Sequence, residues 1–197
     1  MRFEFSTSNR ILFGPGTRAE VPALAASFGQ RAFVVTDSQE RCKDLLRGMQ
    51  LQGLVYELSL VKVEPSVDDI LVATRNIREF APDLIISLGG GSALDTGKAA
   101  AVFLTNPGNL LDYLEVVGAG IPLKNPALPF IAMPSTAGTG SEVTRNAVLS
   151  LPERRIKVSL RSPFLLPRVA VVDPELTYSL LPSVTAATVM DALTQLI

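Results

Sequence analysis

A run of small residues at positions 89–92, Gly-Gly-Gly-Ser, has the composition of a loop that binds phosphate. Residues without a Cβ let backbone N–H groups approach a ligand, and the free N–H groups at the start of a helix favour an anion. The run follows an apolar segment, 84–88, that we predict to be a buried strand. Ligands of open α/β sheets bind beyond the carboxyl ends of strands. We therefore predict a phosphate-binding loop, with a turn that only packs helix on sheet as the alternative.

A second polar loop, 134–142, follows another apolar segment, 130–133. It contains four hydroxyl side chains and two glycines, which can donate hydrogen bonds to a phosphate or an amide. Two such loops at two strand ends lie at the same edge of a parallel sheet. One extended ligand explains this arrangement better than coincidence does.

Asp37 ends a third apolar segment, 31–36, and two roles are open for it. In dinucleotide-binding folds an acid at a strand end binds the ribose diol, and its charge opposes the 2′-phosphate of NADP. Aspartate is also a common helix N-cap. The first role predicts a preference for NAD over NADP, which replacing Asp37 with glycine should narrow.

Two further carboxylates lie on predicted helices. Asp95 and Lys98 are one turn apart after the glycine run, where a surface ion pair is open for both and a structural role or one near the substrate is open for Asp95. Asp191 lies on the apolar side of the last predicted helix, one turn before Gln195. Because a single carboxylate is no metal site, these residues alone assign Asp191 no function.

The composition excludes several function classes. The 197 residues include no histidine, which removes the Ser-His-Asp triad and histidine metal ligands. With 18 Lys+Arg against 19 Asp+Glu and no basic block, we expect no nucleic-acid partner. No apolar run reaches the roughly 18 residues of a membrane helix, and Cys42 has no disulfide partner, so we expect a cytoplasmic protein without membrane contact.

Two named phosphate motifs are absent. The G-x-G-x-x-G fingerprint would need glycine at Leu94, and the P-loop would need glycine at Ser92 and a hydroxyl residue at Ala99. An ATP-dependent phosphotransferase is therefore only a weak alternative.

Apolar runs alternate with helical patterns along most of the chain. This order predicts a Rossmann-like, doubly wound α/β fold with a mostly parallel sheet and helices on both faces. We also expect a short N-terminal β-hairpin (2–5 with 10–13), an antiparallel pair (143–151 with 156–160), and a last helix from Pro182. The predicted domains are 1–181, which binds dinucleotide, and 182–197, the first helix of a truncated helical metal-binding domain.

Several segments, in this order, resemble the iron-containing, or group III, alcohol dehydrogenase family. The matching segments are 13–16, 35–37, 89–98, 135–144, Lys157, 173–177 and 190–194. The resemblance implies an NAD(P)-binding α/β domain and a helical domain, with a divalent metal, Fe²⁺ or Zn²⁺, between them. It implies an oxidoreductase that interconverts alcohols and aldehydes or ketones by hydride transfer, with a small alcohol or aldehyde as substrate.

The resemblance also implies roles for individual residues. Carried over by position, Gly90, Gly91 and Ser92 hold the pyrophosphate and Asp37 the adenosine ribose, while Thr136, Thr139, Val148 and Lys157 complete the site for NAD or NADP. Asp191 is implied as the first metal ligand. The chain departs from the pattern at Gln195, which replaces a histidine ligand and binds iron or zinc poorly, and at Glu64, which replaces an asparagine.

Family members continue into the helical domain, which supplies the remaining ligands. We therefore expect an N-terminal fragment that binds dinucleotide but does not oxidise alcohols. The alternative is a non-catalytic dinucleotide-binding module that has lost its helical half. Apolar residues at the end of the last helix favour self-association, so we expect a homo-oligomer, a dimer.

Overall fold

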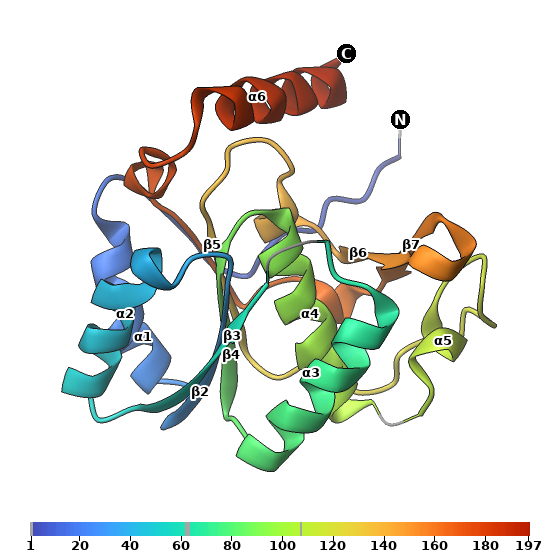
Figure 1. Cartoon of the computed structure of the whole chain (residues 1–197), viewed down its shortest axis with the longest axis horizontal. Coiled ribbons are helices and arrows are strands. Elements are labelled where there is room, and N and C mark those ends of the chain that lie inside the picture. Colours follow the sequence, from blue (N-terminus) through green and yellow to red (C-terminus); the bar gives the residue numbers. More distant parts are fainter. Residues whose placement is uncertain (1, 62–63, 107) are drawn as a thin grey trace.

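The computed structural model describes residues 2–61, 64–106 and 108–197. Within them, six strands form one parallel sheet in the order β1-β8-β5-β4-β2-β3, and two more form an antiparallel hairpin (Figure 1). The sheet strands are β1 (Ile11–Phe13), β2 (Arg31–Thr36), β3 (Val55–Leu60), β4 (Leu84–Gly89), β5 (Phe130–Pro134) and β8 (Val169–Val172). The hairpin strands are β6 (Asn146–Leu151) and β7 (Ile156–Arg161).

Helices cover both faces of the sheet. One face packs against α1 (Val21–Ala26) and α2 (Gln39–Leu51), and the other packs against α3 (Val67–Phe80) and α4 (Gly91–Thr105) (Figure 1). Two further helices are α5 (Leu110–Tyr113) and α6 (Pro182–Leu196). Short 3₁₀ turns are η1 (Thr17–Glu20), η2 (Ser141–Val143), η3 (Pro152–Arg154), η4 (Pro163–Leu165) and η5 (Pro174–Thr177).

The central strands are apolar on both sides because both faces are covered. Along β2, Val34 joins the core beneath α1 and α2, while its neighbours Phe33 and Val35 join the core beneath α3 and α4. Side chains of a strand alternate between faces, so a strand covered on both sides must be apolar at every position. A third core lies between α4 and the β6–β7 hairpin. The hairpin is thereby fixed against the helix that follows the glycine run.

The prediction of a doubly wound, mostly parallel α/β fold is confirmed. The antiparallel pair is also found, as β6 and β7. The N-terminal hairpin is wrong: residues 2–5 form no strand, and β1 pairs in parallel with β8, Ile11 opposite Ala170. Alternation within a short segment predicts extended backbone but does not say which strand completes its hydrogen bonds.

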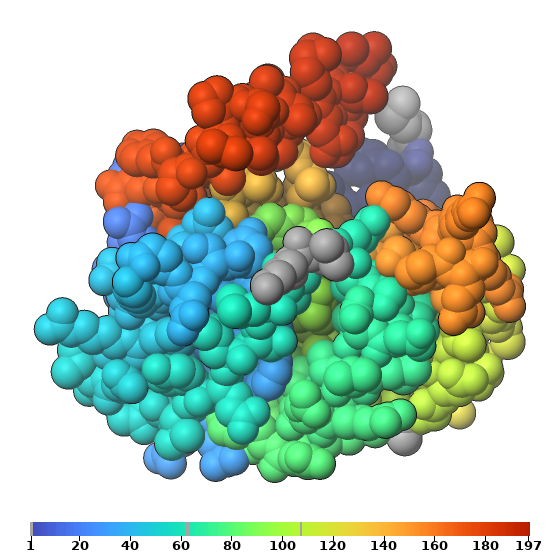
Figure 2. Space-filling model, in the orientation of Figure 1, coloured from blue at the N-terminus to red at the C-terminus, as the bar shows by residue number. Residues whose placement is uncertain are grey.

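The last helix stands apart from the sheet. α6 begins at Pro182, as predicted, and none of its residues is buried. Figure 2 shows it as the red segment at the edge of the molecule, separated from the body by a hollow. The division into domains 1–181 and 182–197 stays a prediction. No helix in the described part of the chain is long and apolar enough to span a membrane.

Candidate functional site

A cleft of ≈ 520 Å³ opens at the carboxyl edge of the sheet, bounded by the start of α4, the loop after β5, the β6–β7 hairpin and α6. The hollow beneath α6 in Figure 2 lies over these elements. The cleft brings together six residues predicted for the site: Gly91, Ser92, Thr139, Val148, Lys157 and Asp191. Of the others, Gly90 lies beside Thr136 and Asp37, whereas Gln195 does not line the cleft.

The three glycines of the loop differ in whether the fold has room for a side chain. A Cβ on Gly89 would lie 2.7 Å from Ala93 Cβ and 2.9 Å from Asp37 Cγ, so the fold itself excludes a side chain there. A Cβ on Gly91 would come no closer than 3.4 Å to any neighbour, which is ordinary van der Waals contact, and Gly90 is similar. Neither has a positive φ. The fold therefore has room for a Cβ at Gly90, against Thr136, and at Gly91, against Thr139, and Gly91 lines the cleft.

Asp37 connects the end of β2 to this loop. Its Oδ2 accepts a hydrogen bond from the Gly90 backbone N–H at 2.9 Å, and its Oδ1 forms an ion pair with Arg41. The N-cap of α2 is Ser38, whose hydroxyl accepts from the Arg41 backbone N–H. The alternative role of Asp37 as the helix cap is therefore wrong. Its side chain is about one-third exposed beside the glycine loop, where a ligand can reach it.

Lys98 is buried and Asp95 is partly buried, and the two belong to one network. Lys98 Nζ donates to Ser141 Oγ at 2.9 Å, to Thr144 Oγ1 at 3.1 Å and to the Asn146 carbonyl at 2.9 Å. Asp95 accepts from Ser141 Oγ at 2.6 Å and from the Val148 backbone N–H at 3.0 Å. The surface-pair alternative for Lys98 is therefore wrong, and the network fixes the hairpin wall of the cleft to α4.

Burial dominates the titration of this pair. It lowers the pKa of Lys98 to about 8, although the nearby carboxylates of Asp95 and Glu142 act in the opposite direction. It also raises the pKa of Asp95, against the effects of Lys98, Ser141 and the Val148 N–H. For each group, the loss of hydration on burial affects the pKa more than the attraction of the opposite charge does.

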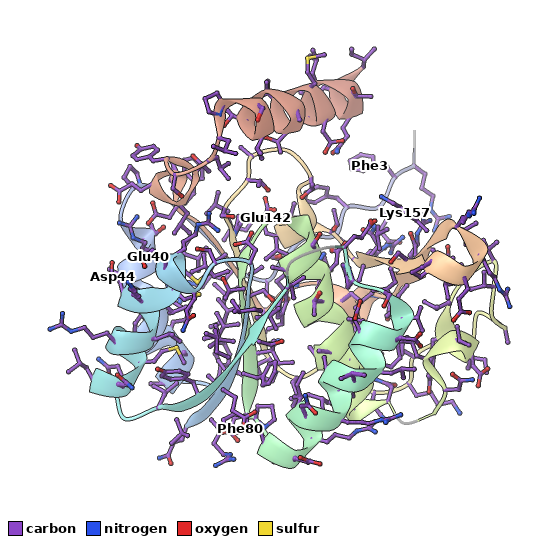
Figure 3. The ribbon with its side chains drawn as sticks, viewed as in Figure 1. Phe3, Glu40, Asp44, Phe80, Glu142 and Lys157 are labelled. Carbon is purple, nitrogen blue, oxygen red and sulfur yellow. The ribbon has the colours of Figure 1, made fainter. Side chains whose placement is uncertain are left out.

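The outer end of the cleft carries an exposed ion pair. Lys157 Nζ lies 2.9 Å from Glu64 Oε2, and both residues line the cleft. Figure 3 shows Lys157 projecting from the hairpin. Glu64 stands where the family resemblance expects asparagine, so this chain has an additional carboxylate opposite Lys157 at the cleft.

The described residues do not assemble a metal site around Asp191. Asp191 is exposed on α6, and its Oδ2 accepts from Gln195 Nε2 at 3.2 Å. The described residues contain no group of three or more His, Cys, Asp or Glu side chains that could hold a metal ion. The residues present therefore do not fit Fe²⁺ or Zn²⁺.

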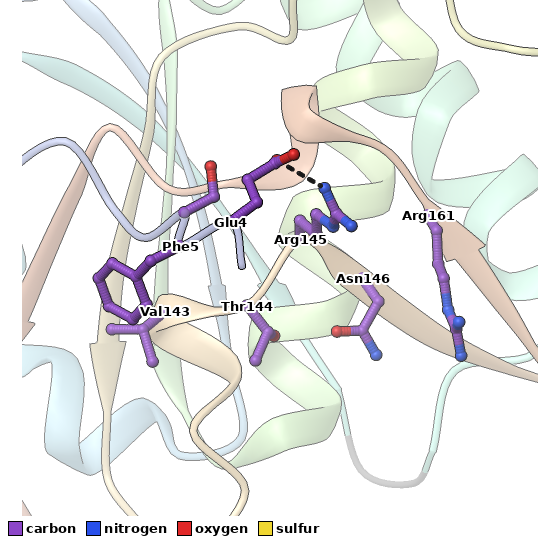
Figure 4. Close-up of a pocket in the computed structure, with 8 residues that line it drawn as sticks. Glu4, Phe5, Val143, Thr144, Arg145, Asn146 and Arg161 are labelled. Carbon is purple, nitrogen blue, oxygen red and sulfur yellow. Dashed lines mark ion pairs between the residues drawn. The ribbon is translucent and has the colours of Figure 1, made fainter. Parts of the chain in front are cut away.

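A second cavity of ≈ 490 Å³ borders the first at Thr144 and Asn146. Figure 4 shows Glu4 and Phe5 beside Arg145, which comes directly before β6, and Arg161 at the end of β7. Glu4 and Arg145 form an ion pair at 3.7 Å. Apart from the shared pair, none of the residues around it belongs to the glycine loop or the network. The first cavity, which holds the predicted residues, is the candidate site.

Comparison with known proteins decides the family. The family model "Iron-containing alcohol dehydrogenase" matches residues 8–174. The chain belongs to this family. The sequence of sulfoacetaldehyde reductase from Bilophila wadsworthia is 37% identical over 201 residues, which cover 98% of this chain and 50% of that protein. 4-Hydroxybutyrate dehydrogenase from Cupriavidus necator is 36% identical, over 83% of this chain and 44% of its own length.

Solved structures of the family agree with the fold. A 1,3-propanediol oxidoreductase superposes with a TM-score of 0.90 at 32% identity, over 98% of this chain and 51% of that one. Sulfoacetaldehyde reductase from Bifidobacterium kashiwanohense, in complex with NAD⁺, superposes with a TM-score of 0.88 at 32% identity, over 99% of this chain and 52% of that one. The chain thus spans about half the length of these relatives.

Sequence analysis missed several residues of the site. It did not assign Arg41, although Asp37 comes directly before the N-cap of α2 and Arg41 lies in the first turn of that helix. It also gave no role to Asn146, whose carbonyl accepts from Lys98. No local signal places that carbonyl, because the contact joins residues 48 positions apart.

Proposed function

We propose that this chain forms the dinucleotide-binding part of an NAD(P)-dependent oxidoreductase that interconverts alcohols with aldehydes or ketones. The observation that carries the proposal is that the fold has room for a Cβ at Gly90 and Gly91, so packing within the chain does not require glycine at either position, and Gly91 lines the cleft. Family membership and the NAD⁺ complex of a relative with the same fold support it.

In this proposal each side of the cleft binds one part of the cofactor. The backbone N–H groups at the start of α4 bind the pyrophosphate together with Ser92, because the helix dipole and the free donors favour an anion. Asp37 accepts from the adenosine ribose, and Thr136 and Thr139 line the pyrophosphate and nicotinamide. Val148 and Lys157 complete the site. Bound NAD⁺ would supply the carbon that accepts a hydride.

Replacing Gly91 with alanine tests whether the missing side chain at this position serves ligand binding. We expect NAD⁺ affinity to fall by roughly tenfold or more, because a Cβ would occupy the place of the pyrophosphate. The melting temperature should stay the same, since this Cβ clashes with nothing in the chain. Titration calorimetry and thermal unfolding measure the two effects.

Gly89→Ala is the matched control. Its Cβ meets Ala93 and Asp37 closely, so this variant should lose about 1–3 kcal/mol of unfolding free energy. If Gly91→Ala binds NAD⁺ as tightly as the parent chain, the loop is only a packing turn. Tight binding of ATP with no response to NAD⁺ or NADP⁺ would instead support the phosphotransferase alternative.

The 197-residue chain should bind NAD⁺ without oxidising alcohols. The expectation follows from Asp191, which belongs to no group of three or more His, Cys, Asp or Glu side chains among the described residues. Absorbance at the NADH band, measured with short alcohols and added Fe²⁺ or Zn²⁺, checks it. Metal-stimulated NADH formation by the purified chain would contradict it. NAD⁺ binding without turnover is also expected of the non-catalytic alternative. The length of the intact gene distinguishes that alternative from a fragment of an oxidoreductase.

A further inference from the structure

Arg41 is a cation placed directly beside the residue proposed to bind the adenosine ribose. It lies in the first turn of α2, between Glu40 and Asp44, which Figure 3 labels. Its Nη1 pairs with Asp37 Oδ1, and its Nη2 lies 3.5 Å from Ser179 Oγ. Its side chain is only 16% exposed.

The guanidinium is only partly used by the folded chain. Its Nε is buried and has no hydrogen-bond partner. The side chain borders a cavity of ≈ 360 Å³ between α1, α2 and the sheet, into which Arg18 and Asp44 also face. Arg18 forms ion pairs with Asp173 and Glu175. The carboxylate that pairs with Arg41 is Asp37.

Each carboxylate oxygen of Asp37 already has one partner in the chain. One carboxylate oxygen holds the Gly90 N–H and the other holds Arg41. A lone aspartate at this place repels the 2′-phosphate of NADP⁺, whereas a nearby arginine accommodates it. This chain has both groups, joined as an ion pair, so the charge of one offsets the charge of the other.

We propose that Arg41 is a second determinant of the choice between NAD⁺ and NADP⁺. It reduces the discrimination that Asp37 alone would impose, and it binds the 2′-phosphate once Asp37 is removed. An arginine freed from its carboxylate presents several N–H donors to a phosphate, and such charge-assisted hydrogen bonds are among the stronger ones. This inference rests on the proposed dinucleotide site.

Four proteins test it: the parent chain, Asp37→Gly, Arg41→Gln and the double variant. Calorimetry gives the NAD⁺ and NADP⁺ affinities of each. We expect Asp37→Gly to raise NADP⁺ affinity relative to NAD⁺ by roughly tenfold more when Arg41 is present than when it is glutamine. Arg41→Gln alone should shift the ratio towards NAD⁺, because it exposes the charge of Asp37.

Arg47→Gln is the matched control, since it removes the same charge from an exposed position of the same helix and should leave the ratio unchanged. Arg41→Met, which keeps the apolar stem, replaces Arg41→Gln if that variant melts early. An equal effect of Asp37→Gly in both backgrounds would overturn the inference while NAD⁺ binding by the parent chain persists. Absence of NAD⁺ binding by the folded parent chain would instead overturn the proposed function.

Discussion

Lys98→Ala is expected to lower the free energy of unfolding by about 3–5 kcal/mol, the cost of breaking a buried ion pair from one side. The side chain of Lys98 is 1% exposed, and its three hydrogen bonds all go to residues of 141–146. The change leaves a cavity where the stem packed and removes the cation that lies 3.8 Å from Asp95. Urea unfolding at neutral pH measures the loss.

Lys43→Ala is the matched control for this prediction. Lys43 pairs with Glu40 on the surface of α2, and its side chain is 66% exposed. A solvent-exposed pair contributes at most about 1 kcal/mol, so the stability of this variant should stay near that of the parent chain. Equal losses in the two variants would show that the network around Lys98 does not hold the hairpin on α4.

Lys98 also makes stability depend on pH in a way that can be isolated. Burial lowers its pKa from 10.5 to about 8, so the folded chain releases this proton before the unfolded chain does. Unfolding then takes up a proton between these pH values, and folded-state stability rises with pH in that window. Asp95 has the opposite sign, with stability falling as pH rises above 3.8, in the acidic range.

Subtracting the stability of Lys98→Met from that of the parent chain cancels the contributions of the other groups that titrate at alkaline pH. The stability of the parent chain minus that of Lys98→Met should increase by roughly 2–3 kcal/mol between pH 7.5 and pH 10.5, at about 1.36 kcal/mol per pKa unit. Urea unfolding across this range gives the difference. A constant difference would mean that Lys98 keeps its ordinary pKa, and a decreasing one would mean that the charged form is the better-stabilised one.

The network also shows where sequence patterns stop being informative. The strands β2, β4 and β5 were predictable because parallel strands covered on both faces are mostly apolar, and each is a short run dominated by apolar residues. The two polar loops were predictable because they follow such runs directly. These are local properties, which can be recognised from the sequence alone.

Contacts between distant segments were not predictable in this way. Spacing placed Asp95 and Lys98 on one face of α4. This face is covered because residues 141–148 pack against it, which the spacing does not predict. For the same reason the partner of β1 is β8, about 160 positions away, rather than the extended segment beside it in the chain. The cap of α2 was uncertain by one residue, since Asp37 and Ser38 are both good caps.

Gly97→Ala should destabilise the chain by about 1–3 kcal/mol, even though alanine favours a helix interior by about 1 kcal/mol. Gly97 lies on the face of α4 that contacts β4 and β5. A Cβ there would lie 2.0 Å from Ser87 Oγ and 2.6 Å from Phe130 Cε2, so the helix or these side chains must move. Urea unfolding of the single variant measures the loss.

Ser87→Ala provides the test that the clash is the cause. Ser87 Oγ is buried without a hydrogen-bond partner, so its removal alone should change stability little. In the Gly97→Ala background it should recover part of the loss, while the contact with Phe130 keeps the rest. Additive effects, within about 0.5 kcal/mol, would contradict this explanation.

The same pair of variants connects packing to the proposed site. Gly97 lies on the helix that begins at Gly91, beside the cleft. If the new Cβ pushes α4 away from the sheet, the N–H groups at its start move away from the proposed pyrophosphate position, and NAD⁺ affinity should fall. Ser87→Ala should then restore part of the affinity together with part of the stability. Recovery of stability without affinity would show that the glycine loop is positioned by Asp37 and Gly89 instead of by the packing of the helix.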